Sequence, residues 1–182
     1  MRHVLNTIYR LSGGLAALFI LGIVLLVFAQ VCLNLADKIA AALLGKGIGL
    51  TIPSYSDFTG FFLAAASFLA LAYALRAGGH IRVTLLTNRF SKPVRRTLEG
   101  LVTIIALAMS SYATWYMILL VLESHEFGDR SPGMVSLPLW IPQLPVAIGL
   151  AVLSLALLDE LIAILRGRTP AWDGKGENLL SE

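Results

Sequence analysis

Charged residues are scarce in this sequence. Asp, Glu, Lys and Arg together make up only 14% of its 182 residues, whereas a soluble domain typically carries about 25%. The mean hydropathy is +0.80, and 57% of the residues are hydrophobic. This composition excludes an ordinary soluble protein and indicates an integral membrane protein. The length leaves room for one domain only.

Long apolar runs account for most of the chain. A hydrocarbon core of ~30 Å needs about 20 predominantly apolar residues in a helix. Because backbone groups in lipid must bond within their own segment, each such run is predicted to be helical. The sequence therefore predicts an all-α integral membrane protein with four transmembrane helices, at residues 11–33, 58–75, 98–122 and 141–165.

Cysteine and histidine are also rare. Cys32 is the only cysteine, which excludes an intrachain disulfide and a cysteine-based metal cluster. His3, His80 and His125 lie in predicted tails or loops on opposite sides of the membrane, so they do not form the facing pair that a bis-histidine haem needs. No GxSxG, HExxH or GxxxxGK pattern occurs. We therefore predict no catalytic residue, no metal site and no cofactor.

The basic residues predict an orientation. Four spans place both termini on one side, with the tails at residues 1–10 and 166–182 and the loop at residues 76–97. These segments hold eleven Lys and Arg residues, and the opposite side holds three. Short loops rich in Lys and Arg stay in the cytoplasm, so both termini are predicted to be cytoplasmic. The basic residues lie at the ends of spans rather than on a soluble face, and no nucleic-acid partner is predicted.

Ionisable residues are absent from the middle of the four runs. Asp159 and Glu160 lie about one and a half turns from the cytoplasmic end of the last run. Coupling sites of pumps and transporters normally include ionisable residues deep in the membrane. The chain is therefore not predicted to transport a substrate alone, and we expect this acidic pair to bond a cytoplasmic arginine. Such a chain fits a subunit that supports a larger partner.

Small residues mark two predicted packing faces, since helices associate in lipid where small side chains allow close approach. These faces are expected to meet other helices, either of this chain or of a partner. In the second run Gly60 and Ala64, and then Ala66, Ala70 and Ala74, are spaced four apart. The first run begins with a group of small residues, namely Ser12, Gly13, Gly14, Ala16 and Ala17.

The stretch ALRAGGHIRVTLLTNRFSKPVRR, residues 74–96, holds six of the fourteen basic residues. Gly78 and Gly79 are expected to end the second helix, and His80 to fix the turn by hydrogen bonding or, as the alternative, to respond to protons. Beyond it we predict a short amphipathic helix in the cytoplasmic interface, between helices 2 and 3. The residues expected to face lipid phosphates are Arg82, Arg89, Lys92, Arg95 and Arg96.

The two outer connections differ. Residues 34–57 contain GKGIG and IPSYSD and are predicted to be irregular. Residues 123–140, ESHEFGDRSPGMVSLPLW, carry three acids against one arginine and predict either a docking surface for an external partner or a solvated acidic loop. The candidate docking residues are Glu123, Glu126, Asp129 and Arg130.

Two motifs resemble a known family, the small membrane subunit of TRAP transporters (DctQ-like). The string RAGGHIRVTL is similar to its loop signature, and LWIPQLPVAIG to the opening of its last helix, which we expect to start near Pro142. The matching loop residues are Arg76, Gly79, His80, Ile81, Val83 and Leu85. The matching residues of the last helix are Trp140, Pro142, Pro145 and Gly149. The resemblance covers residues 1–182 as a single DctQ-like membrane domain.

The resemblance implies a function. Members of this family are subunits of bacterial secondary transporters in the inner membrane that import organic acids, usually with sodium. The implied partners are a large permease subunit (DctM-like), a periplasmic substrate-binding protein (DctP-like) and membrane lipids. The small subunit is expected to brace the large one and to help dock the binding protein, without enzyme activity. The alternative is a membrane anchor or assembly subunit of a redox or signalling enzyme complex.

Overall fold

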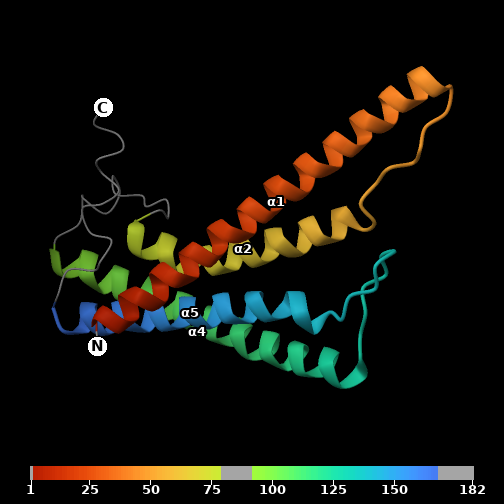
Figure 1. The fold of residues 1–182 in the computed structure, drawn as a ribbon. Helices are drawn as coiled ribbons and strands as arrows, with labels where there is room; N and C mark the ends of the chain where they lie inside the picture. Colours follow the sequence, from red (N-terminus) through yellow and green to blue (C-terminus); the bar gives the residue numbers. More distant parts are fainter. Residues whose placement is uncertain (1, 79–91, 168–182) are drawn as a thin grey trace, which may run out of the picture.

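Four long helices make up the fold. The computed structural model describes residues 2–78 and 92–167 (Figure 1). Within these ranges the helices are α1 (Arg2–Leu44), α2 (Tyr55–Ala77), α4 (Lys92–Phe127) and α5 (Trp140–Leu165), and no strand occurs there. All four are long and apolar enough to cross a membrane. The predicted all-α class with four membrane-spanning helices is confirmed.

The helices are longer than the runs that predicted them. α1 has 43 residues, which at 1.5 Å per residue is ~64 Å, about twice the thickness of the hydrocarbon core. The prediction that residues 34–57 are irregular is wrong at both ends, because α1 continues to Leu44 and α2 already begins at Tyr55. The segment DKIAAALL is rich in Ala and Leu, which favour helix. α1 ends where Gly45 takes a φ of 74°.

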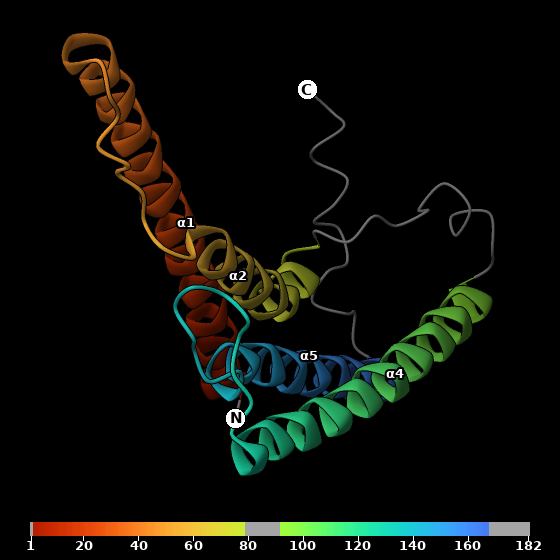
Figure 2. The same cartoon turned by 90° about the vertical axis from the view of Figure 1, so that its right-hand side faces the viewer.

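The described helices pack as two hairpins. α1 packs against α2, and α4 against α5, while α2 and α5 form the main contact between the two hairpins (Figures 1 and 2). α1 reaches α5 at only a few positions. As a consequence much of the apolar surface of α1 and α4 faces outward: Leu25 is 59% exposed and Met109 69% exposed.

Small residues are buried on α2 and on α5, and the backbones of the two helices meet at Gly149. Ala65, Ala66 and Ala72 are buried on α2, and Gly149 is buried on α5. A Cβ added at Gly149 would lie 2.5 Å from the carbonyl carbon of Phe68. No side chain fits there, so glycine allows the two helix backbones to touch. Among the small residues of α2 that were predicted to pack against another helix, Ala66 is buried and Gly60 is exposed.

The start of α1 packs on α2 through some of its small residues, so the partner that the sequence left open is a helix of this chain; Gly14 and Ala17 are exposed. Ser12 and Ala16 are buried. The Ser12 hydroxyl donates a hydrogen bond of 2.6 Å to the carbonyl oxygen of Leu69. A Cβ at Gly13 would lie 2.8 Å from the ring of Tyr73. Leu69 follows Phe68 directly, so one turn of α2 contacts both α1 and α5.

Candidate functional site

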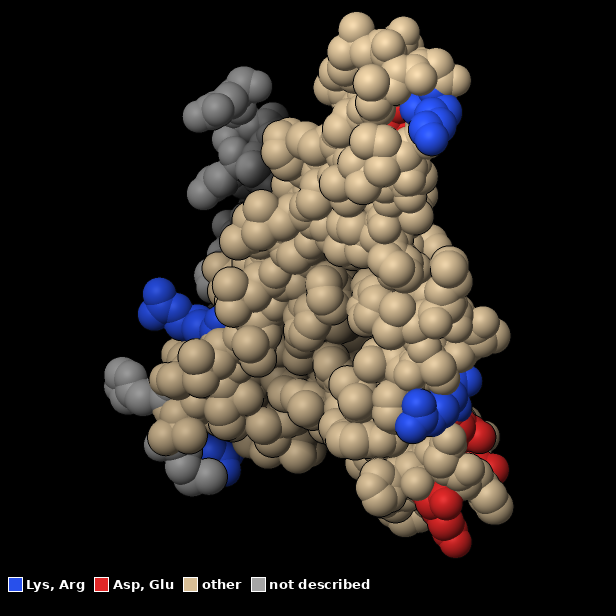
Figure 3. Space-filling model, turned by 45° about the vertical axis from the view of Figure 1, so that its right-hand side comes forward, with Lys and Arg blue, Asp and Glu red and all other residues tan. Residues whose placement is uncertain are grey.

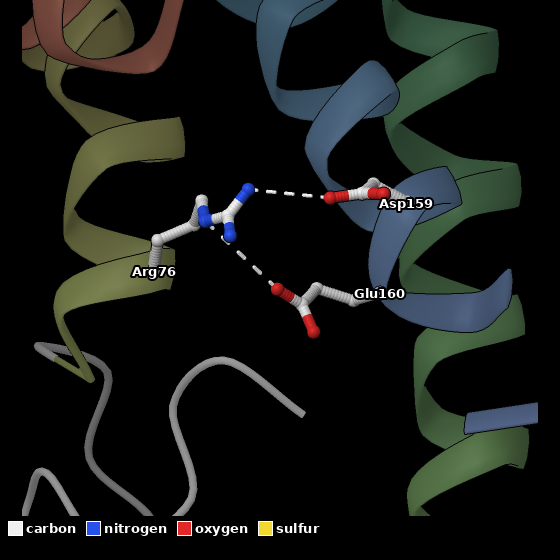
Figure 4. A network of polar contacts seen from close by, with 3 residues as sticks. All are labelled: Arg76, Asp159 and Glu160. Carbon is white, nitrogen blue, oxygen red and sulfur yellow. Dashed lines mark hydrogen bonds and ion pairs between the residues drawn. The ribbon is translucent and has the colours of Figure 1, made fainter. Parts of the chain in front are cut away.

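A partly buried charged cluster links α2 to α5 at the end where α1 begins (Figure 4). Nη1 of Arg76 lies 3.2 Å from Oδ2 of Asp159, and its Nε lies 4.0 Å from Oε1 of Glu160. The Glu160 side chain is only 3% exposed, and a carboxylate removed from water needs a partner of opposite charge. The prediction that the acidic pair bonds an arginine is confirmed, and that arginine is the first residue of the family-signature loop.

Tyr9 brings α1 into the same cluster. Its ring lies under the guanidinium of Arg76, 4.9 Å from Cζ to the ring centroid, in a cation–π arrangement. The ring is 2% exposed and packs with Ala72 and Ala156. Among the described residues its hydroxyl has no hydrogen-bond partner. Three helices therefore meet around Arg76. The position of Tyr9 in the sequence does not reveal that it packs against this arginine.

A second arginine secures the start of α4. Nε and Nη2 of Arg96 donate to the carbonyl oxygen of Ile164 at 3.0 and 2.6 Å, and Nη2 also donates to that of Leu165 at 3.2 Å. The last carbonyls of a helix lack intrahelical partners, so Arg96 caps α5. Arg95 pairs with Glu99 at 3.0 Å, one turn along α4. The sequence did not predict that Arg96 binds the end of α5 or that Arg95 pairs with Glu99. The contact of these two arginines with lipid stays a prediction.

The rest of the basic loop is only partly described. Gly78 ends α2 with a φ of 77°, and its N–H points to the carbonyls of Ala74 and Leu75, so the expected glycine exit is confirmed. Lys92 begins α4. The predicted interfacial helix lies outside the described residues, as do Gly79, His80, Ile81, Arg82, Val83, Leu85 and Arg89.

The connection between α4 and α5, residues 128–139, folds back on itself. We call it the outer hairpin, because it belongs to the side that is predicted to face the periplasm. The N–H of Leu139 donates to the carbonyl of Asp129 at 2.9 Å, and that of Ser131 to the carbonyl of Leu137 at 2.8 Å. The N–H of Leu137 also donates to the Ser131 hydroxyl at 3.0 Å. These bonds close the outer hairpin at two levels and give it a defined shape.

The candidate docking residues lie together at this end of the molecule. Glu123 and Glu126 are on the last turns of α4, and Asp129 and Arg130 are on the outer hairpin; all four are exposed. In Figure 3 acidic side chains gather where α4 ends, with a basic side chain beside them. The middle of the face in that view shows neither acidic nor basic side chains. The structure thus brings the four residues to one polar end.

The last-helix motif occupies the beginning of α5. α5 starts at Trp140, two residues before the expected Pro142, and Pro145 lies inside it. The ring of Trp140 meets that of His125 edge-on, with 5.5 Å between centroids, which joins α5 to the end of α4. Gly149 lies at the crossing with α2. The motif therefore contributes one contact of α5 with α4, at Trp140, and one with α2, at Gly149.

A buried glutamine fixes the connection between α1 and α2. Gln30 is buried, and its Nε2 donates to Asn34 Oδ1 at 2.9 Å and to Thr51 Oγ1 at 3.1 Å. Its Oε1 accepts from the N–H of Ile52 at 2.8 Å. The returning chain therefore lies along α1. A lone Gln in an otherwise apolar run is the signal by which the sequence could have revealed this contact.

Hydroxyl groups form hydrogen bonds between α4 and α5. Ser154 Oγ lies 3.0 Å from Ser110 Oγ and 3.3 Å from Thr114 Oγ1. The Thr114 hydroxyl also donates to the backbone carbonyl of Ser110 at 2.7 Å. Such bonds join helices within a membrane. In the described part of the chain no group of three or more His, Cys, Asp or Glu residues is arranged to hold a metal ion.

Comparison with known proteins identifies the family. Residues 23–167 match the family model described as "Tripartite ATP-independent periplasmic transporters, DctQ component". The chain is also 28% identical, over an alignment of 196 positions, to the C4-dicarboxylate TRAP transporter small permease protein DctQ of Pseudomonas aeruginosa. That alignment covers 91% of this chain and 88% of the relative. With its four membrane-length helices, the chain is a multi-pass protein of the bacterial inner membrane. It belongs to the DctQ family of small permease subunits of TRAP transporters.

Proposed function

We propose that this small permease subunit is a static brace for the large permease subunit of a transporter that imports organic acids. The main observation behind this proposal is the open packing of its helices. Within the described residues, one face of α1 and one face of α4 are not covered by other helices. No Asp, Glu, Lys or Arg occurs in residues 11–33, 58–75, 100–122 or 141–158. The subunit thus offers apolar surface rather than transport chemistry.

Bracing requires a broad surface and a firm body. Exposed apolar side chains such as Leu18 and Leu25 on α1 and Val102 and Met109 on α4 are suited to helices of a membrane partner as well as to lipid. The two hairpins are joined by the backbone contact at Gly149 and by the Arg76 cluster. These contacts support a rigid subunit, as a static scaffold requires.

The polar outer end is suited to a second partner. Glu123, Glu126, Asp129 and Arg130 lie on the side that the excess of Lys and Arg elsewhere assigns to the periplasm. Their net charge is negative, and we propose that they meet a basic region of the periplasmic substrate-binding protein. Complementary charge of this kind raises association rates and fixes orientation.

The substrate class rests on the family and on the relative, whose name specifies C4-dicarboxylates. Organic acids are accordingly the proposed cargo, with sodium as the proposed coupling ion. This chain has no ionisable residue in the middle of its predicted spans with which to bind either one. Substrate and sodium are therefore assigned to the large subunit and the binding protein.

Co-expression with the large permease subunit tests this proposal. The two chains should purify as one complex in mild detergent or lipid nanodiscs, and uptake of an organic acid by cells should require both. Separate purification under these conditions contradicts bracing. Co-purification with cytoplasmic enzyme subunits instead would support the role of an enzyme anchor.

A further inference from the structure

We propose that Ser54 is a positioning residue that holds the outer hairpin against the start of α2. Its place in the chain, just before α2, gives no hint of a contact with residues 128–139. Three independent features of the structure point to this role: its backbone conformation, the partner of its hydroxyl and the close packing of Gly133 beside it. The effect of Ser54 on docking of the periplasmic binding protein rests on the function proposed above.

The backbone of Ser54 is in an unfavourable conformation. Its φ is 54° and its ψ 26°, in the left-handed region, and among the described residues it is the only non-glycine residue with a positive φ. A side chain with a Cβ rarely adopts this region. Such a conformation persists where surrounding contacts fix it, and residues of this kind cluster at functional positions.

The hydroxyl of Ser54 is used in an unusual way. A serine that precedes a helix normally accepts a hydrogen bond from the first turn of that helix, but Ser54 makes no such side-chain bond. Its Oγ accepts instead from the N–H of Val135, at 3.0 Å, across 81 residues of sequence. Its carbonyl oxygen still accepts from the N–H of Asp57 at 3.0 Å. The residue thus begins α2 with its backbone and binds the outer hairpin with its side chain.

Gly133 shows how tightly the hairpin tip packs. A Cβ added there would overlap Oδ2 of Asp57 and lie 2.7 Å from Oγ of Ser54. The backbone of the tip therefore lies against the side chains of Ser54 and Asp57. A hydrogen bond from the N–H of Leu139 to the carbonyl of Asp129 closes the base of the outer hairpin, so fixing the tip also restrains two of the candidate docking residues, Asp129 and Arg130, at the base. This contact joins the two helical hairpins at the outer end.

The position of the tip can be measured directly. Cys32 is first replaced by serine, and spin labels are placed at Met134→Cys and Leu63→Cys, both of which are exposed. Double electron–electron resonance in nanodiscs should give one narrow distance distribution for the parent protein. S54A and G133A should each broaden or shift it. S56A is the matched control, since Ser56 is exposed in the first turn of α2, and it should leave the distribution as in the parent.

S54G separates the hydroxyl from the backbone, because glycine accepts a positive φ and has no hydroxyl. It should broaden the distribution as S54A does. A distribution like that of the parent in S54G, or in both S54A and G133A, overturns the proposal.

A second measurement separates this inference from the docking function. Binding of the periplasmic binding protein to the complex in nanodiscs should weaken in S54A and not in S56A. Weakened binding without a change in the spin-label distances contradicts a positioning role for Ser54. A changed distance distribution with unaltered binding leaves Ser54 as a positioning residue and contradicts the docking function of the outer hairpin.

Discussion

Gly149 on α5 lies against the backbone of Phe68 on α2, at a point where a Cβ would be 2.5 Å from the carbonyl carbon. The next residue of α2, Leu69, accepts a hydrogen bond from Ser12 of α1. Three helices are therefore joined through one turn of α2 by backbone contact and small side chains. In lipid, where apolar side chains gain little by leaving their surroundings, such close packing is a main source of helix association.

The first prediction concerns this crossing. Gly149→Ala should force α2 and α5 apart and reduce stability by about 1–3 kcal/mol, the usual effect of overpacking. Thermal unfolding in detergent, followed by loss of helicity, measures the change. Gly60→Ala is the matched control, since Gly60 lies on α2 with nothing within 4 Å of an added Cβ. Equal melting temperatures for the two variants would show that the close contact is absent.

The second prediction concerns the buried charges. Arg76→Gln removes the guanidinium from both Asp159 and Glu160 and should cost ~3 kcal/mol or somewhat less, because the arginine is partly accessible. Asp159→Asn should cost less, since Glu160 remains near Arg76. Chemical unfolding curves give the free energy of unfolding of each variant and so test whether Arg76→Gln is the more destabilising change. Exchanging the pair, as Arg76→Asp with Asp159→Arg, should recover part of the loss, and a double variant no better than Arg76→Gln alone contradicts a specific ion pair.

The third prediction concerns the cap on α5. Arg96→Gln should lose the charged hydrogen bonds to Ile164 and Leu165, at a cost of about 1.5–3 kcal/mol. Hydrogen exchange of the final turn of α5 should increase in this variant. Arg10→Gln is the control, because Arg10 is exposed at the same end of the molecule. If exchange rises equally in both variants, loss of basic charge at the membrane surface explains the effect and the cap does not.

The fourth prediction concerns the acidic outer end. Replacing Glu123, Glu126 and Asp129 with lysine should weaken binding of the periplasmic binding protein and leave the two-subunit membrane complex intact. The difference from the parent should shrink at high ionic strength, since exposed charges are screened over about 10 Å at 0.1 M salt. Surface plasmon resonance on nanodisc complexes measures both effects. The same number of reversals in the C-terminal tail, at Asp173, Glu177 and Glu182, provides the control. Unchanged binding after reversal at the outer end would remove the docking role.

The main features of the fold could be predicted from the sequence because lipid imposes strict rules on length and polarity. The four apolar runs correspond to four helices. The acidic residues Asp159 and Glu160 lie beside an arginine, because a carboxylate in an apolar helix needs a partner. The extension of α1 to Leu44 was missed, since the glycines near residue 45 and the nearby polar residues masked a segment that favours helix.

The individual partners could not be predicted. Tyr9 lies under Arg76, and Ser54 binds Val135, through contacts between residues 67 and 81 positions apart. No local pattern marks these pairs, because each depends on how two hairpins pack in space. Arg96 was predicted to face lipid from its place in a basic cluster, and the carbonyls it caps belong to a helix end 68 residues away. Charge patterns predict which end of the molecule a residue occupies, whereas packing decides its partner.

The most direct test of the brace is to ask what covers the apolar faces of α1 and α4. A photo-reactive amino acid is placed at Leu25 of α1 or Met109 of α4, and at the buried Leu69 as a control, in cells that also make the large permease subunit. Our account predicts that illumination links at least one of the two exposed positions to the large subunit and that Leu69 gives no such product. If neither exposed position, nor others along the same faces, yields a link to the large subunit while both proteins are in the membrane, the bracing role is contradicted.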